Sequence, residues 1–449
     1  MDSRQRRASI VPEVVKTFRH RVAEHGECQR CKNNSPVVEG ETERAARCAV
    51  LVPASIQIWV ATNSVWRMIL DMPTAKELRR ALKQALPKEA FQPQPWRGVR
   101  ALLMAILSLT LAVIIVTTDL HWVLDLLLAV IIGERMAAVL LCAHESMHGA
   151  VFTRPWARQL LSWVGFAPLL VTPGLWHAWH NRAHHRGANH PEFDPDTLAS
   201  LDQYQASWST RIRTKMTPGS GHWLSAFGFF CLFTLEGQFY LWIASGEAPL
   251  LGRIAVERNK LRLSSTALIA CWLGLAIWLG LVHTLLVLVI PLIVANMIMM
   301  GYISTQHWIR PQVREDDPFS STMSVRVPKI VDWLHFEFSY HQEHHIFPSM
   351  SGRFGPLVRE KLREIEPRAI AVLPMQTALW EVLRLPALYA DNRWLVRPDD
   401  GRQVDLHSVA QRLELPTRFN SMPAPHMLSK QGVSAGARAH ESQADRQRA

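Results

Sequence analysis

The sequence predicts an all-α integral membrane protein in which two transmembrane helical hairpins, four spans in all, carry a histidine-rich helical cap with interfacial helices. Its 449 residues are 48% hydrophobic, include 17 tryptophans and carry a formal charge of +11, which suits a membrane protein with basic cytosolic parts. Four stretches approach the roughly 20 apolar residues that cross a bilayer as a helix. Short groups of histidines follow these stretches, which places a polar site just outside the membrane.

The four apolar stretches form two pairs. They cover residues 99–117, 122–142, 263–281 and 285–303. Only a few residues around Asp119 separate the first pair, and residues 282–284 separate the second, so each pair predicts a helical hairpin. A hairpin returns the chain to the side of the membrane on which it started.

Basic residues predict which side that is. They crowd the N-terminal approach, the long middle segment and the C-terminal part, and in the first two regions they are Arg79, Arg80, Lys83, Lys88, Arg97, Arg100, Arg211, Arg213, Lys215, Arg258, Lys260 and Arg262. Because cytosolic segments near membrane helices are rich in Lys and Arg, we expect all three regions on the cytosolic side. No clustered basic face is interleaved with stacking aromatic residues, which argues against nucleic acid as a partner.

Two further apolar stretches, 159–175 and 223–243, are expected to lie along the cytosolic surface as interfacial or re-entrant helices. If the second of them alone crossed the bilayer, the histidines after residue 300 would be on the opposite side from those before residue 190. Three charged residues inside the second span, Asp125, Glu134 and Arg135, are costly in lipid, so we expect them to face the bundle or to pair with each other.

The two ends of the chain are expected to lie outside the folded domain. Residues 1–71 lack sustained periodicity, and their single CxxC motif has no second cysteine pair, so they predict a disordered extension. We expect the domain over 72–395, with Met72 as an alternative start, and a C-terminal tail over 396–449 that is disordered after about 420. The six cysteines form no disulfide framework, which fits a reducing compartment, and no cleavable signal peptide is evident.

Histidines form four groups just beyond the apolar elements. They are His144 and His148 in HESMH, His180, His184 and His185 in HAWHNRAHH, His307 in STQHW, and His341, His344 and His345 in HQEHH. Residues four apart on a helix share a face, so each of the pairs 144/148, 180/184 and 341/345 is expected to point at one metal ion. The neighbours His184 and His185 are about 100° apart on a helix, which suits two adjacent ions better than one.

The number of histidines indicates how many ions they bind. A structural zinc ion closes with four ligands and a catalytic zinc ion with three and a water, so nine imidazoles are too many for one zinc. Imidazole also binds iron, copper and nickel, and therefore the ligand type alone does not select the metal. Two ions with four or five nitrogens each match the count, and two redox-active irons give the arrangement a use. Soluble di-iron bundles achieve this with more carboxylates than are present here.

These motifs resemble those of the membrane fatty acid desaturases and of their relatives, the membrane hydroxylases, alkane monooxygenases and carotenoid ketolases. The resemblance rests on HESMHG, HNRAHHRGANHPEFDPD, QHW and YHQEHHIFP, in that order, over residues of about 75 to 365. It implies a di-iron centre whose ligands are His144, His148, His180, His184, His185, His307, His341, His344 and His345. No catalytic residue is expected beyond this centre.

The sequence departs from the acyl-CoA desaturases of the family at two points. Those enzymes have an Asn one helical turn before the ligand on the fourth span, where this chain has Ile303. Asn296 lies eleven residues before His307, about 16 Å along a helix, which is too far to replace that ligand. The haem motif HPGG of a fused cytochrome is also absent, so the electrons are expected from a separate donor of the ferredoxin or cytochrome b5 type.

Polar residues beside the histidines are expected to orient them. A metal-bound histidine usually donates its other ring N–H to a nearby acceptor, which fixes the tautomer. The candidates for this role are Glu145, Asn181, Asp194, Asp196 and Glu343.

The resemblance implies an O2-dependent fatty acid desaturase that removes two hydrogens from a long acyl chain arriving from the bilayer. A hydroxylase or ketolase of the same superfamily, acting on a lipid or hydrocarbon, stays open as the alternative, because no motif decides between loss of a second hydrogen and return of oxygen. A histidine-rich membrane metal transporter is the remote alternative. It would carry polar ligands within its spans, whereas these lie beyond them.

Overall fold

The computed structural model describes residues 73–192, 194–243 and 251–417. Within them the protein is mostly helical, as predicted. Three predictions fall outside the described residues: the disordered N-terminal extension, the alternative start site and the disordered end of the C-terminal tail. The description below therefore concerns the part of the chain that carries the histidines.

The first described elements pack against the HQEHH motif and the residues that follow it. They are the helix α4 (Ala75–Ala85) and the 3-10 turn η3 (Lys88–Phe91). A capping box starts α4, because the Thr74 hydroxyl accepts the Glu77 amide proton at 3.2 Å and the Glu77 carboxylate accepts the Thr74 amide proton at 2.8 Å. Leu78 and Leu82 share one face of α4 and are buried in a small core with Ile346.

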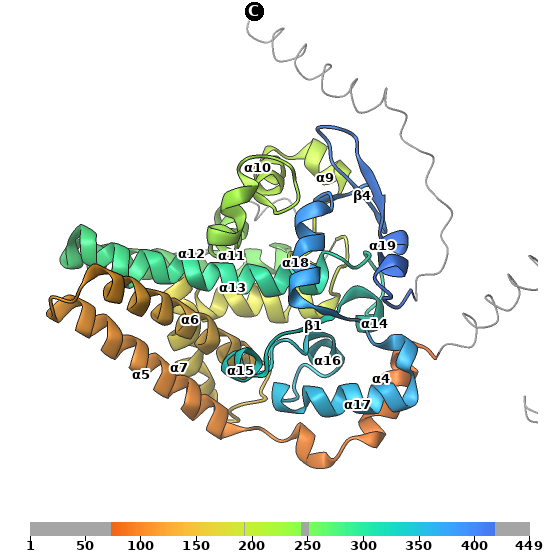
Figure 1. Cartoon of the computed structure of the whole chain (residues 1–449), viewed down its shortest axis with the longest axis horizontal. Helices are drawn as coiled ribbons and strands as arrows, with labels where there is room; N and C mark the ends of the chain where they lie inside the picture. The colour runs from red at the N-terminus through yellow and green to blue at the C-terminus, as the bar shows by residue number, and fades with distance from the viewer. Residues whose placement is uncertain (1–72, 193, 244–250, 418–449) are drawn as a thin grey trace, which may run out of the picture. The chain divides into compact units, whose positions relative to one another are not determined.

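The first apolar pair forms two long helices that pack side by side (Figure 1). They are α5 (Pro95–Thr117) and α6 (Trp122–Met147). Only a small share of α5 is buried, whereas more than half of α6 is buried against its neighbours, so α6 is the inner helix. Within α6 the side chains of Glu134 and Arg135 form an ion pair, as predicted for charged residues in this span.

The second apolar pair folds back on itself at Gly280. Its elements are α12 (Leu251–Thr284), the π-helical turn η7 (Leu285–Val289) and α13 (Ile290–His307). Gly280 has φ 72°, a conformation that favours glycine. Thr284 donates its hydroxyl proton to the Ala276 carbonyl at 2.9 Å, and residues eight apart in a straight helix would be about 12 Å apart. The chain therefore reverses between these two residues.

Three described helical segments are long and apolar enough to cross a membrane. They are Pro95–Thr117, Trp122–Met147 and Glu257–His307. The third contains both arms of the second pair, which makes it long enough for two passages. Length and composition thus support a membrane protein, and the number of passages belongs to the proposal below.

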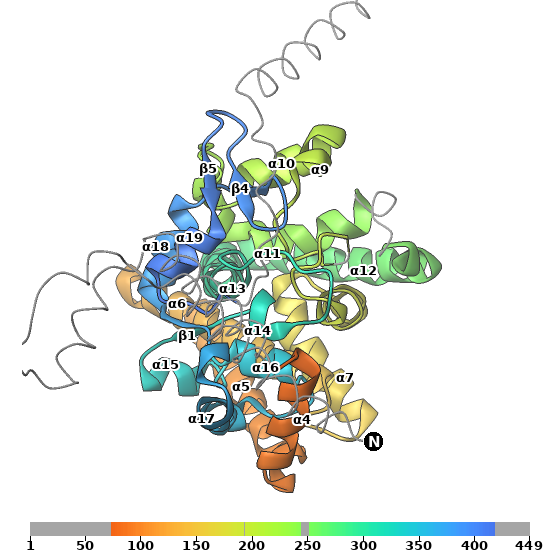
Figure 2. The same ribbon diagram turned by 90° about the vertical axis from the view of Figure 1, so that its right-hand side faces the viewer.

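The two other apolar stretches form shorter or transverse helices. The elements of this region are α7 (Pro155–Phe166), η4 (Ala167–Leu169), α8 (Pro173–Trp176), η5 (His177–Asn181), η6 (His184–Arg186), α9 (Leu201–Ala206), α10 (Trp208–Met216) and α11 (Ser225–Trp242). Twelve residues of α7 span about 18 Å, less than the roughly 30 Å of a hydrocarbon core. Figure 2 shows α13 nearly end-on and α11 running across it. Neither α7 nor α11 is among the described helices that are long and apolar enough to cross a membrane.

The C-terminal part combines short helices with two small sheets. Its elements are α14 (Pro318–Ser321), β1 (Ser324–Arg326), α15 (Lys329–Leu334), α16 (His341–Ile346), η8 (Gly352–Phe354), α17 (Gly355–Ile365), η9 (Pro367–Ala369), β2 (Val372–Pro374), α18 (Met375–Arg384), β3 (Leu388–Tyr389), β4 (Trp394–Val396), β5 (Gln403–Asp405) and α19 (Leu406–Arg412). β1 pairs with β2 in parallel, and β3, β4 and β5 form an antiparallel sheet. Side chains of α6, α13 and α18 share the main core, which surrounds the histidines.

Candidate metal centre

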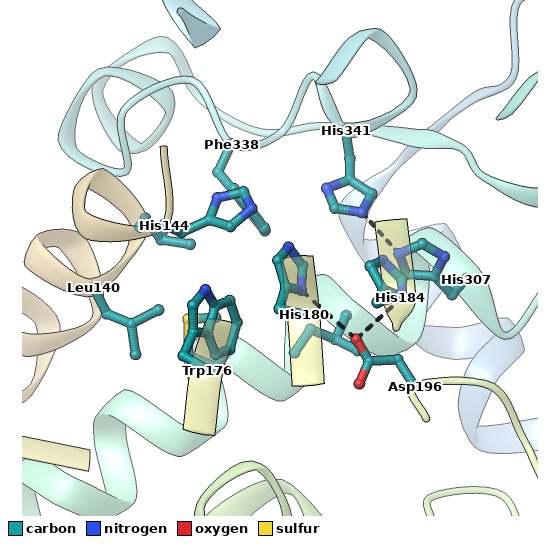
Figure 3. A pocket seen from close by; sticks show the side chains of 12 residues that line it. Leu140, His144, Trp176, His180, His184, Asp196, His307, Phe338 and His341 are labelled. Carbon is teal, nitrogen blue, oxygen red and sulfur yellow. Dashed lines mark hydrogen bonds and ion pairs between the residues drawn. The ribbon is translucent and has the colours of Figure 1, made fainter. Parts of the chain in front are cut away.

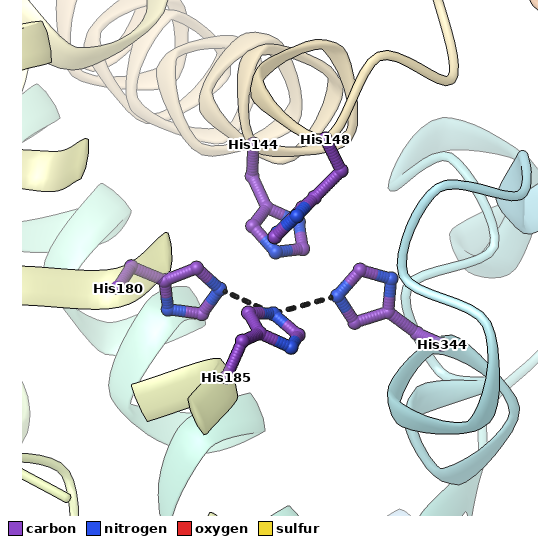
Figure 4. A group of neighbouring side chains, drawn as sticks. All are labelled: His144, His148, His180, His185 and His344. Atoms are coloured by element: carbon purple, nitrogen blue, oxygen red, sulfur yellow. Dashed lines mark hydrogen bonds between the residues drawn. The ribbon is translucent and has the colours of Figure 1, made fainter. Parts of the chain in front are cut away.

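All nine predicted ligands lie in two groups of side chains. The first, the five-histidine group, is His144, His148, His180, His185 and His344 (Figure 4). The second, the four-histidine group, is His184, His307, His341 and His345. Within each group one ring nitrogen per residue lies within 4.8 Å of the others. The division into five and four matches the two ions expected from the histidine count.

Two of the three expected i, i+4 pairs remain together in one group. His144 and His148 end α6 on one face and both belong to the five-histidine group. His341 and His345 on α16 both belong to the four-histidine group. The short helix α16 also contributes His344 to the other group, so it serves both.

His180 and His184, which were expected to point at one ion, fall in different histidine groups, but both also belong to a third group with Asp196 that could hold an ion. His180 belongs to the five-histidine group and His184 to the four-histidine group. The reason is that no regular α-helix joins them: His180 lies in the π-helical turn η5, and His184 begins the 3-10 turn η6. His184 and His185 do diverge to different groups, as expected for adjacent residues.

The spacing of the ring nitrogens fits metal coordination. In the four-histidine group the Nε2 atoms of His307 and His341 are 2.7 Å apart, those of His341 and His345 3.0 Å, and those of His184 and His345 3.2 Å. Two nitrogens bound to one ion at about 2.1 Å, near a right angle, lie about 3 Å apart. The rings are thus already at the separation of neighbouring ligands.

Several buried ring nitrogens have no hydrogen-bond partner among the described residues. Both ring nitrogens of His144 are in this state, as is Nε2 of His148. His144 is only 2% exposed, so bulk solvent does not reach these nitrogens. Buried polar atoms are nearly always paired, and a cation between the rings would pair these nitrogens. The donor set therefore fits a metal ion.

Two carboxylates orient the second histidine motif. His184 Nδ1 donates to Asp194 at 2.7 Å and lies 3.3 Å from Asp196. Asp196 lies 4.0 Å from His180 Nδ1 and accepts the Trp179 indole proton at 2.6 Å. An acceptor at Nδ1 fixes the tautomer that leaves Nε2 for a metal.

An amide lies beside the five-histidine group. Asn181 Nδ2 is 3.3 Å from His148 Nδ1. The roles of donor and acceptor in this contact depend on the histidine tautomer. Asn181, Asp194 and Asp196 thus all contact histidine rings, at the positions expected of orienting residues.

The expected role of Glu145 and Glu343 is corrected by the structure. Within the described residues neither carboxylate contacts a histidine nitrogen. Glu145 accepts hydrogen bonds from Arg97 at 2.7 and 3.1 Å, and Glu343 accepts them from Arg359 at 2.6 and 3.1 Å. A guanidinium is the stronger partner for a buried carboxylate, because it is charged and offers two parallel donors.

Burial keeps most of the histidines uncharged. Burial alone would lower the pKa of His184, but the carboxylates of Asp194 and Asp196 raise it to about 9. Burial raises the pKa of Asp196 to about 7.

Burial and neighbouring rings lower the pKa of His148 to about 3. They hold the pKa well below its usual range for His180, His185, His341, His344 and His345. The uncharged ring is the form that binds a metal.

A small cavity of about 10 Å³ lies between the two groups (Figure 3). Its lining residues are His144, His180, His184, His307, His341, Asp196, Trp176, Phe338, Leu140, Leu141, Met299 and Ile303. The cavity thus combines rings of both histidine groups with apolar side chains of α6 and α13. This volume is about that of one water molecule.

The position of Ile303 agrees with the departure seen in the sequence. Its side chain lines the cavity near His307, where an asparagine would be a ligand candidate. Asn296 has another role: it accepts a hydrogen bond from the Thr234 amide and donates one to the Thr234 hydroxyl, both at 3.0 Å. It therefore joins α13 to α11 and does not reach the histidines.

Sequence reasoning missed several residues that contact the histidines or their motifs, among them two aromatic residues and two arginines. Trp176 stacks on His180 with the ring centres 4.4 Å apart, and Phe338 meets His144 edge-on at 5.4 Å. The arginines are Arg97 and Arg359. Arg97 was expected among the basic residues of the cytosolic N-terminal approach, and the structure shows that it is fully buried. Its sequence signal, a basic residue at the start of an apolar helix, is shared by interfacial arginines such as Arg100.

Together the fold and the site define a mostly helical protein with membrane-length helices and two buried histidine groups able to bind metal. The model of the family described as fatty acid desaturase matches residues 120–376, more than half of the chain and all nine histidines. The chain therefore belongs to the fatty acid desaturase family, which implies an oxidoreductase. No curated protein matches it.

Proposed function

We propose that the protein is an O2-dependent di-iron desaturase that introduces a double bond into a long acyl chain. The observation that carries the proposal is the division of nine histidines into groups of five and four around one cavity. Removal of hydrogen from an unactivated methylene is beyond acid–base side chains, and a pair of irons supplies that oxidation when bound. The proposed ligands are the nine histidines of the two groups.

The lining of the cavity supports an apolar substrate. Leu140 and Met299 come from the membrane-length helices, and Ile303 follows on the same helix as Met299. A methylene group that enters from the bilayer along these side chains would reach the rings of both histidine groups. Because the cavity has room for about one water-sized group, we expect side chains of α6 and α13 to move when an acyl chain binds.

We further propose four membrane passages and a cytosolic metal centre. α5, α6 and the two arms around Gly280 have the required length and composition. α11 is not among the described helices that are long and apolar enough to cross a membrane, so we propose that it does not cross. With these passages all nine histidines lie on one side, next to the basic segments.

The proposed partners are the acyl chain from the bilayer and a separate electron donor. O2 is the co-substrate, and each double bond requires two external electrons. A ferredoxin or a cytochrome b5 type protein is proposed as the donor, because the sequence has no fused haem motif.

The test is expression in a host of known lipid composition with mass spectrometry of its fatty acids. We expect a new unsaturated acid from the parent and none from His344→Ala, which removes one ligand of the five-histidine group. The matched control is His177→Ala, since His177 precedes the second motif but belongs to neither group. A hydroxy acid would favour the alternative hydroxylase, and an unchanged profile from iron-loaded protein with a working donor would refute both.

A further inference from the structure

The motifs HESMH and HQEHH each contain a glutamate that is bound by an arginine from another helix. Glu145 stands between His144 and His148, and Glu343 stands between His341 and His344. Both carboxylates are buried. Because neither contacts a histidine, their function is not that of a direct acceptor for a ligand, and the arginines that bind them need an explanation.

Arg97 joins the HESMH motif to the segment that precedes the HQEHH motif. Its side chain, 0% exposed, donates to the Glu145 carboxylate at 2.7 and 3.1 Å and to the Glu337 carboxylate at 2.5 Å. It also donates to the Phe336 carbonyl at 2.8 Å. Glu145 in turn accepts the Gly352 amide proton at 3.1 Å. One guanidinium therefore connects α5, α6 and the chain before α16.

The segment that Arg97 contacts has an unfavourable backbone. Phe336 and Glu337 have φ of 54° and 55°, the left-handed region that residues with a Cβ avoid. Such conformations persist where surrounding contacts fix them. Phe338 follows directly and lines the cavity. The Arg97 contacts thus hold the backbone at Phe336 and Glu337, directly before Phe338.

Arg359, which lies in α17, binds the HQEHH motif. Its guanidinium forms two parallel hydrogen bonds with Glu343, at 2.6 and 3.1 Å, and lies over the Tyr340 ring at 4.1 Å. Glu343 also accepts the Ser324 hydroxyl proton at 2.6 Å, and the same hydroxyl accepts the Gln342 amide proton at 3.0 Å. These bonds fix how α16 is rotated about its axis.

We infer that Arg97 and Arg359 are positioning residues of the metal centre, an inference that rests on the proposed function. Arg97 acts through Glu145 on His144 and His148, which both belong to the five-histidine group. Arg359 acts through Glu343 on α16, whose histidines belong to both groups. Arg97 therefore tunes one metal site, and Arg359 tunes both.

The test is Co²⁺ titration of the full-length protein and of arginine-to-lysine variants, with bound metal per chain as the readout. Lysine keeps the charge but lacks the planar pair of donors. For Arg97→Lys we expect one of two binding phases to weaken by about 10- to 100-fold, and for Arg359→Lys both phases. The matched control is Arg412→Lys, because Arg412 forms a similar fork with Glu381, at 2.8 and 2.9 Å, on elements that carry no histidine of either group.

The two phases are assigned with single ligand variants. The phase lost in Arg97→Lys should be the one lost in His148→Ala and retained in His307→Ala. Circular dichroism and thermal unfolding show whether each variant is folded. If Arg97→Lys does not fold, Glu337→Gln weakens the same set of contacts at a partly exposed carboxylate and carries the same expectation.

The outcomes separate this inference from the proposed function. Equal weakening of both phases in Arg97→Lys and in the Arg412→Lys control would show a general effect on stability and overturn the positioning role. Unchanged titrations in both folded site variants would overturn it as well, while the proposed function stands. A parent protein that binds no Co²⁺ would refute the metal centre itself, and the inference with it.

Discussion

The two histidine groups differ in how deeply their side chains are buried. All members of the four-histidine group are buried, and their Nε2 atoms follow one another at 2.7 to 3.2 Å. The five-histidine group includes half-buried rings, and both nitrogens of His144 lack a partner among the described residues. In the five-histidine group the Nε2 atoms of His180 and His185 are also 3.0 Å apart and those of His185 and His344 3.1 Å apart, so the two groups differ chiefly in burial. We expect the four-histidine group to bind its metal more tightly.

Removal of His184 is expected to have the largest effect on this difference. His184→Ala deletes a ligand of the four-histidine group and leaves Asp194 and Asp196 buried without their ring. We expect one of the two proposed ions to be lost and the yield of unsaturated product to fall more than about 100-fold. Iron per chain and fatty acid analysis measure this. Loss of the weaker ion instead would reverse the comparison.

Substitution of Asp194, whose carboxylate contacts the His184 ring, is expected to have a smaller effect on metal binding. Asp194→Asn keeps the shape of the side chain but removes the charge that His184 contacts at 2.7 Å. Affinity at the four-histidine group should fall about 10- to 100-fold, with the other group unchanged. Metal titration measures this, with the exposed Asp202→Asn as the control. Equal weakening at both groups would contradict the assignment.

A substitution at Ile303 tests whether the four-histidine group can gain a fifth ligand, as the other group has. Ile303→Asn brings an amide oxygen into the cavity one turn before His307. We expect the visible spectrum of Co²⁺ in the four-histidine group to change, at a cost in stability of about 1–3 kcal/mol for the buried amide. Ile303→Val, which adds no donor, is the control. A spectrum like that of the control would show that the side chain does not reach the ion.

The smallest effect is expected at the cap of α4. Thr74→Ala removes the hydroxyl that accepts the Glu77 amide proton, which should lower the free energy of unfolding by about 1 kcal/mol. Leu78 and Leu82 of α4 pack against Ile346 of α16. The substitution therefore tests whether a less stable α4 alters metal binding by the histidines of α16. We expect a lower midpoint of thermal unfolding with both titration phases unchanged. A selective loss of one phase would contradict this.

The sequence predicted the histidines better than their grouping. Motif spacing identified all nine rings, and the count predicted two ions. The separation of His180 from His184 depends on a π-helical turn followed by a 3-10 turn, and no residue pattern in HAWHNRAHH distinguishes these from an α-helix. Local spacing describes a regular helix, so it fails where tertiary packing changes the helix type.

The partners of Glu145 and Glu343 were beyond sequence reasoning for a different reason. Glu145 meets an arginine 48 positions away, and Glu343 meets one 16 positions away. Such pairings follow from the packing of α5 and α17 against the motifs, which periodicity does not report. For the same reason Arg97, a charged residue at the start of an apolar helix, gave no sign that it is buried.

The six residues of α16 have a consequence for the pair of ions as a unit. His344 belongs to the five-histidine group and His341 and His345 to the four-histidine group, so a single helical turn contributes to both. A rigid-body shift of α16 would move its three histidines together and keep their mutual spacing. Inserting one residue between His344 and His345 would instead turn His345 by about 100° and break the register between the two sites. The length of this turn is therefore as much a part of the centre as the imidazoles it carries.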